Sequence, residues 1–294
     1  MLQEVFRMNE INKGSFANYA DSFDSDLALE RKKASTYVEG VDYKRDVCLG
    51  GVWERLKVTS EAGEKSIGRP MGLYDTLTLP RMDSITPEDV SDATDEVARE
   101  LCRMCDLSDI LPQRVLVVGL GNRDLTPDAI GPAAASEVEP TMHIKELDAE
   151  MFESLACSEI SVICPDVTSN TGLSALDTVR GVCDAIDPDV VIAVDSLASR
   201  SGDRLGTTVQ ISNTGIFPGT GLGHFNYPLN EDTLGVPVIA IGVPTVISSN
   251  AFSSGNGAKN DGLFLSPKGI NRIVKNAGKI IGGGINQAFG MCYF

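Results

Sequence analysis

Two aspartates occupy positions that suit acid–base chemistry. Asp128 lies in the stretch VVGLGNRDLTPDAIGP (residues 117–132), and Asp195 closes the apolar run VVIAVD (190–195). Each follows an apolar run typical of a buried strand, and open α/β sheets bind their ligands beyond the carboxyl ends of the strands. Two carboxyl groups that meet there raise each other's pKa, which leaves one acid and one base at working pH. Either aspartate can carry the proton in such a pair.

The same residues also allow other interpretations. Asp128 follows Thr126 and Pro127, and an acidic residue in a first helical turn is stabilised by the helix dipole. The glycines 119 and 121 resemble part of a dinucleotide fingerprint, but its third glycine and its acidic ribose partner are missing. Asp124 and Asp166 are similarly placed and are weaker candidates for the pair.

The pattern of apolar runs predicts an α/β fold. From residue 114 onward, such runs alternate with helical patterns, which favours a single domain with a mostly parallel or mixed central sheet flanked by helices. Residues 48–80 are typical of short strands joined by turns, so a small N-terminal β-rich region precedes the α/β core, which we expect from about residue 86. The runs are RVLVVGL (114–120), ISVICPD (160–166), DVVIAVD (189–195), TTVQIS (207–212) and VPVIAIGVP (236–244).

Two helix starts are marked by capping signals. Thr86, Pro87 and Asp89 form a capping-box-like arrangement that predicts a helix from residue 87. Ser266 and Pro267 predict the start of a second helix in LSPKGINRIVKNAGKIIGGGINQAF (265–289).

Composition excludes several classes of protein. The chain has 294 residues and a net charge of −16, which disfavours direct binding to nucleic acid. No apolar stretch approaches the roughly 20 residues of a membrane span, and the N-terminus lacks a signal-peptide pattern. Seven scattered cysteines are typical of a reducing cytoplasm. The two histidines, His143 and His224, give little support to a metal site, so we expect no metal and no cofactor.

Longer blocks of sequence carry a resemblance to a known family. The blocks VVGLGNRDLTPDAIGP, VVIAVDSLASRSGDRLGTTVQISNTGIFPGTGLG and TLGVPVIAIGVPTV closely resemble the germination protease family of spore-forming Firmicutes. The segments DSDLALE and VTSEAGEKSIGRPMGLYDTL match its earlier part, and the last helix also matches. The resemblance covers the chain from about residue 24 to 289.

This resemblance implies an endopeptidase that degrades small acid-soluble spore proteins during germination. The family is regarded as an atypical aspartic protease with a fold similar to hydrogenase maturation proteases. Its two essential aspartates fall on Asp128 and Asp195. It also implies a homotetramer in the cytoplasm of the forespore and spore core, with no membrane partner.

The resemblance further implies cleavage after glutamate and an autoprocessing zymogen. An acidic side chain needs a cationic partner, and Arg200 and Arg204, which match family positions, are the expected ones. The segment SDLALE (25–30) is similar to the family's processing site. We therefore expect a cut near Asp26 and Leu27, with residues 1–26 as a propeptide and 27–294 as the protease domain.

The chain departs from the family in places, and two rival functions stay open. Arg123 and Asp124 stand where Bacillus-type members carry Trp-Asn, so we expect this loop to differ in its contacts with substrate. One rival is a nickel-dependent protease of the hydrogenase maturation type, in which His224 would serve as a metal ligand. The other is a catalytically inactive module that binds spore proteins.

Overall fold

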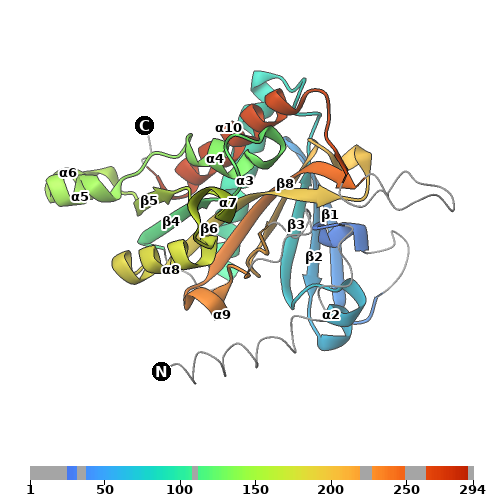
Figure 1. Cartoon of the computed structure of the whole chain (residues 1–294), viewed down its shortest axis with the longest axis horizontal. Helices are drawn as coiled ribbons and strands as arrows, with labels where there is room; N and C mark the ends of the chain where they lie inside the picture. Colours follow the sequence, from blue (N-terminus) through green and yellow to red (C-terminus); the bar gives the residue numbers. More distant parts are fainter. Residues whose placement is uncertain (1–24, 32–37, 108–111, 219–226, 249–262, 291–294) are drawn as a thin grey trace.

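A computed structural model of the chain describes residues 25–31, 38–107, 112–218, 227–248 and 263–290. Their strands are β1 (Val41–Cys48), β2 (Gly51–Val58), β3 (Gly72–Thr78), β4 (Arg114–Gly119), β5 (Glu159–Ile163), β6 (Val190–Ser199), β7 (Thr208–Ser212), β8 (Val238–Ser248) and β9 (Phe264–Leu265). They form one 9-stranded sheet in the order β1-β2-β3-β7-β8-β6-β4-β5, with β9 paired to β8 (Figure 1).

The sheet is mixed, as predicted. Strands β8, β6, β4 and β5 run parallel to one another. Strands β1, β2, β3 and β7 form an antiparallel part, which joins the parallel part where β7 pairs with β8. The predicted α/β fold with an N-terminal β-rich region is therefore confirmed.

Helices cover both faces of the parallel part (Figure 1). The helices are α2 (Glu61–Ile67), α3 (Pro87–Leu107), α4 (Ile130–Ala135), α5 (Met142–Leu147), α6 (Ala149–Leu155), α7 (Thr168–Thr171), α8 (Ala175–Ile186), α9 (Glu231–Leu234) and α10 (Ile270–Phe289), with 3-10 helices η1 (Ala28–Arg31), η2 (Thr126–Asp128) and η3 (Gly202–Arg204). Ile192 and Val194 of β6 face the core under α3, α4 and α10. Val191 and Ala193 face the second core, under α8 and α9. Among the described helices, none is long and apolar enough to cross a membrane.

The two predicted helix starts have different outcomes. The start of α3 is confirmed, because the Asp89 N–H donates to Thr86 Oγ1 at 3.1 Å and the Thr86 N–H donates to Asp89 Oδ2 at 3.3 Å. The start at Ser266 is wrong. Leu265 still pairs with Ile247 of β8, so the chain is extended there and must turn before α10 begins at Ile270.

Helix α2 interrupts the region that we predicted as strands and turns alone. Its N-cap is Ser60, whose hydroxyl accepts from the Gly63 N–H, and its C-cap is Gly68 in the left-handed conformation, with φ of 65°. Because this conformation favours glycine, the helix ends there and the chain turns into Arg69 and Pro70 ahead of β3.

Candidate active site

Asp195 lies where β6 extends past its shorter neighbour. The last residue of β4, Gly119, pairs with Val194, so Asp195 is the first residue of β6 beyond the end of β4. The strand does not stop there as the apolar run suggests, since β6 continues to Ser199 along β8. The Asp195 side chain is buried, with 4% of its surface exposed, and its Oδ1 accepts from the Ser196 N–H at 2.8 Å.

Asp128 lies at the same end of the sheet, beyond the turn that follows β4. It closes η2, and its Oδ2 accepts from the Asn122 N–H at 2.8 Å. Helix η2 is fixed to β8 because Thr245 Oγ1 donates to the Pro127 carbonyl at 2.6 Å. The structure thus holds a half-buried carboxylate beside the fully buried one.

The two aspartates interact electrostatically. Burial raises the pKa of Asp195 well above its usual range, and the negative charge of Asp128 raises it further. The Ser196 N–H opposes this shift, and Asp26 adds to it. The charge of Asp128 thus acts on Asp195, and both the burial of Asp195 and this charge favour its protonated form.

The glycine-containing turn does not form a phosphate cradle. The Leu120 N–H donates to the Val194 carbonyl at 2.8 Å, and the Asn122 N–H is taken by Asp128. Gly119 allows close packing, because a Cβ there would lie 2.5 Å from the carbonyl oxygen of Gly131 in α4. The amides that a pyrophosphate would need are thus used by the protein itself.

The expected cleavage segment lies against β6. The Asp26 N–H donates to the Ala198 carbonyl at 2.9 Å, and Asp26 Oδ2 accepts from the Ala198 N–H at 2.8 Å. Leu27 is completely buried in the second core. Asp26 and Leu27 therefore lie three residues along β6 from Asp195, whereas residues 1–24 are outside the described residues.

The same segment is held again at Glu30. Its carboxylate accepts from Ser199 Oγ at 2.5 Å, from the Arg200 N–H at 2.7 Å and from the Ser201 N–H at 3.1 Å. Charge-assisted bonds of this kind are among the stronger hydrogen bonds in proteins. The segment is consequently tied down at both ends, at Asp26 and at Glu30.

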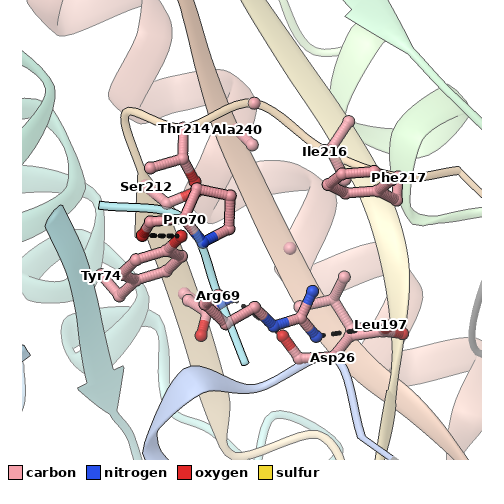
Figure 2. A pocket seen from close by; sticks show the side chains of 13 residues that line it. Asp26, Arg69, Pro70, Tyr74, Leu197, Ser212, Thr214, Ile216, Phe217 and Ala240 are labelled. Atoms are coloured by element: carbon pink, nitrogen blue, oxygen red, sulfur yellow. Dashed lines mark hydrogen bonds and ion pairs between the residues drawn. The ribbon is translucent and has the colours of Figure 1, made fainter. Parts of the chain in front are cut away.

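The two expected arginines have other contacts in the structure. Arg204 Nη1 lies 3.4 Å from Glu54 Oε2 of β2. Arg200 is exposed, and its main-chain N–H donates to Glu30 Oε2 at 2.7 Å. The guanidinium next to Asp26 is that of Arg69, whose Nη2 lies 3.7 Å from Asp26 Oδ1 (Figure 2).

The remaining described candidates either serve a local turn or are exposed. Asp166 accepts from the Val167 N–H at 2.7 Å and from Asn170, so it serves its own turn. Asp124 and Arg123 are exposed, as is His143. His224 is outside the described residues. Within the ranges that the structure describes, no three His, Cys, Asp or Glu residues form a group that could hold a metal ion.

Comparison with known proteins identifies the family. A family profile described as germination protease matches residues 21–256. The chain is 40% identical to the germination protease of Caldanaerobacter subterraneus over 230 residues, which covers 76% of this chain and 69% of that one. It is 31% identical to the germination protease of Clostridium perfringens over 312 residues, with 90% and 94% covered. The chain belongs to the germination protease family.

Further relatives of the family come from Bacillus. The germination protease of Bacillus subtilis is 38% identical over 241 residues, covering 78% of this chain and 64% of that one. Among solved structures, the nickel–iron hydrogenase maturation protease HycI from Thermococcus kodakarensis is similar at 19% identity, with a TM-score of 0.35, over 62% of this chain and 99% of that one.

Sequence reasoning missed three residues that hold the segment around Asp26 against the sheet: Arg69 and Gln210, which contact it, and Glu30, which belongs to it. Gln210 carries a signal that could have been used, because Thr208, Gln210 and Ser212 alternate with apolar residues in TTVQIS and all three are buried. A polar stripe buried on one face of a strand requires partners, which the segment partly supplies. Arg69 and Glu30 carry no comparable signal, since isolated charged residues are ordinary.

Proposed function

We propose that this member of the germination protease family is an endopeptidase that cleaves small acid-soluble spore proteins with the aspartate pair. Membership of a peptidase family gives the reaction class, and the observation that supports the mechanism is the raised pKa of the buried Asp195 beside Asp128. A pair with one proton can act as acid and base at once.

In this mechanism Asp195 carries the proton and Asp128 is the base. Asp128 takes a proton from a water molecule, whose oxygen attacks the scissile carbonyl carbon, while Asp195 gives its proton to the carbonyl oxygen. When the tetrahedral diol collapses, Asp128 protonates the leaving nitrogen as the C–N bond breaks, and the hydroxyl returns a proton to Asp195. The Asn122 N–H, which donates to Asp128, stabilises the ionised carboxylate before attack.

The segment around Asp26 supports autoprocessing by the same pair. It lies in contact with β6, and the charge of Asp26 is felt at Asp195. We propose that residues 1–26 form a propeptide, that the cut falls between Asp26 and Leu27, and that substrates are cut after glutamate. N-terminal sequencing of active protein tests the processing step, and an intact Met1 in a fully active sample would contradict it.

Arg200 and Arg204 stay as predictions for the acidic residue of the substrate. Arg204 would have to leave Glu54 for this role, whereas the side chain of Arg200 is exposed. The homotetramer and the location in the forespore and spore core are likewise proposals carried by the family.

The deciding experiment is incubation with a small acid-soluble spore protein and mass spectrometry of the fragments. Wild type is compared with Asp128→Asn, Asp195→Asn and the exposed control Asp124→Asn. We expect cleavage after glutamate by the wild type and the control, and a loss of at least about a thousandfold in the other two. Full activity in Asp128→Asn would contradict this mechanism.

Two further outcomes address the rival functions. Loss of cleavage in a chelator, restored by nickel, would favour a metal-dependent protease. Capture of the spore protein without cleavage by the wild type, at any pH tested, would favour a binding module.

A further inference from the structure

The docked segment has the backbone contacts of a bound peptide. Gln210 of β7 makes two of them, because the Ala28 N–H donates to its Oε1 at 2.9 Å and its Nε2 donates to the Asp26 carbonyl at 3.4 Å. This one side chain is therefore hydrogen-bonded to the main chain on both sides of Leu27. The Asp26 carbonyl is the carbonyl of the bond that is proposed to be cut.

Gln210 also shares a sheet face with Asp195. Gly242 of β8 pairs with Asp195 on one side and with Gln210 on the other, so the three residues form a row across β6, β8 and β7. Neighbouring strands are about 4.8 Å apart, which places the outer two roughly 10 Å apart. The Leu197 side chain packs directly over Gly242, where a Cβ would lie 2.4 Å from its Cδ1. The pocket beside it is lined by Asp26, Arg69 and Gln210 among others.

Arg69 supplies the positive charge of this pocket. Its Nη2 donates to the Ser25 carbonyl at 3.0 Å and lies 3.7 Å from Asp26 Oδ1, so it contacts the two residues before the proposed cut. Figure 2 shows Arg69 and Asp26 next to each other in the pocket, with Tyr74 and Pro70 beside them.

The contact with Asp26 leaves part of the hydrogen-bonding capacity of the Arg69 guanidinium unused. Its side chain is 17% exposed, and its Nε is buried without a hydrogen-bond partner among the described residues. Nε and Nη2 together form the fork that binds a carboxylate through two bonds. Asp26 Oδ1 lies 3.7 Å from Nη2. A side chain that is longer by one methylene, as in glutamate, would bring its carboxylate closer to that fork.

We propose that Arg69 and Gln210 form the subsite for the acidic residue before the cut. Arg69 binds the carboxylate of this residue. Gln210 donates from its Nε2 to the scissile carbonyl, in the same way as it donates to the Asp26 carbonyl in the structure. This assignment rests on the proposed function, and it makes Arg69 rather than Arg200 or Arg204 the residue that selects an acid.

The specificity of peptide cleavage tests Arg69. The substrates are peptides built on SDLALE with Glu, Asp or Gln before the cut, and the proteins are wild type, Arg69→Gln and the exposed control Arg81→Gln. We expect wild type and control to prefer Glu over Gln by at least about tenfold in kcat/KM, and Arg69→Gln to bring that ratio near one. A retained preference in Arg69→Gln overturns the assignment. Partial loss of folding cannot mimic the expected result, because it lowers both rates equally.

The donor function of Gln210 has its own variant. Gln210→Glu keeps an oxygen for the Ala28 N–H but, when ionised, has no donor for the scissile carbonyl. We expect kcat to fall by about a hundredfold with a much smaller change in KM, since a carbonyl donor acts mainly in the transition state. The exposed control Gln287→Glu should leave kcat unchanged. An unchanged kcat in Gln210→Glu overturns this role.

A measurement without catalysis separates the subsite from the proposed function. Amide hydrogen exchange at Ala28 and Ala198 is followed in full-length Asp195→Asn protein carrying Asp26→Asn, Arg69→Gln or both. If Arg69 binds the carboxylate of Asp26, each single substitution accelerates amide exchange severalfold. The exchange rate of the double variant is then no higher than that of the faster single variant. Additive effects overturn the assignment. Coupled effects together with a wild type that cuts nothing would refute the proposed function while leaving the subsite in place.

Discussion

Gly121 and Asp128 are in direct main-chain contact. Gly121 has a φ of 103°, and a Cβ there would lie 2.1 Å from the Asp128 carbonyl oxygen and 3.1 Å from its Oδ1. Any other residue at this position would clash with Asp128 and displace it.

Replacing Gly121 by alanine therefore tests the position of the aspartate pair. We expect cleavage to fall by about a hundredfold, since a displacement near 1 Å at a reacting group has an effect of this size. Far-UV circular dichroism should stay unchanged. The matched control is Gly172→Ala, also at positive φ but with open space around its Cβ. Equal losses in both variants would show that the effect is on stability.

The pH profile of cleavage tests which aspartate carries the proton. Because burial and the charge of Asp128 raise the pKa of Asp195, we expect Asp195 to act as the protonated acid and kcat to fall as the pH rises through its raised pKa. The check is kcat of a fixed peptide measured from pH 5 to pH 9. A rate that climbs steadily across this range would assign the proton elsewhere.

The raised pKa of Asp195 also makes the stability of the fold depend on pH. The folded-state pKa of Asp195 lies above the unfolded value, so its contribution is fully present below the unfolded pKa and is lost as the pH rises through the folded one. Asp195→Asn keeps the acceptor for the Ser196 N–H and removes the buried charge. We expect its Tm to exceed that of wild type by a few degrees at pH 8 and by little near pH 4. Asp124→Asn, which removes an exposed charge, should match wild type at both.

Glu30→Gln tests how firmly the segment is held. Loss of the negative charge weakens the three hydrogen bonds from Ser199, Arg200 and Ser201. Charge-assisted bonds contribute about 1.5–3 kcal/mol, so we expect amide exchange in residues 26–30 to accelerate by tenfold or more. Glu39→Gln, outside these contacts, is the comparison. Unaltered exchange would mean that the buried Leu27 and the hydrogen bonds at Asp26 and Ala28 fix the segment without Glu30.

A second group of buried charges lies between β3 and α3, away from the aspartate pair. Asp75 contacts Arg55 at 3.0 Å and also Arg103, next to Glu100. Burial, followed by the hydrogen bond and charge of Glu100, raises the pKa of Asp75 to about 7, against the lowering effect of the two arginines.

This raised pKa predicts a pH-dependent stability. The folded state holds the proton more tightly than the unfolded state, so the free energy of unfolding should decrease as the pH rises from about 4 to 7. Asp75→Asn should flatten this part of the profile, whereas Asp95→Asn on the exposed side of α3 should not. Urea unfolding at pH 4.5, 6 and 7.5 provides the measurement, and identical slopes for wild type and Asp75→Asn would contradict the prediction.

The parallel part of the fold and the meeting of Asp128 with Asp195 could be predicted from the sequence. Both follow from local signals, since continuous apolar runs mark central strands and the ends of parallel neighbours converge. The start of α10 could not, because pairing of Leu265 with β8 overrides the cap signal of Ser266.

The subsite was beyond sequence reasoning for a different reason. The contact between Asp26 and Ala198 joins residues 172 positions apart, and that between Ala28 and Gln210 joins residues 182 positions apart. No periodicity connects such distant positions. Only the alternation of polar and apolar residues in β7 indicated that Gln210 needed a partner.

The attachment of Asp26 and Glu30 to β6 also has a kinetic consequence. A peptide on the same chain competes with free molecules as if present at about millimolar concentration. A spore protein at micromolar concentration would seldom displace it. We therefore expect a delay before the first turnover, set by how long the chain's own segment takes to leave and independent of how much spore protein is added.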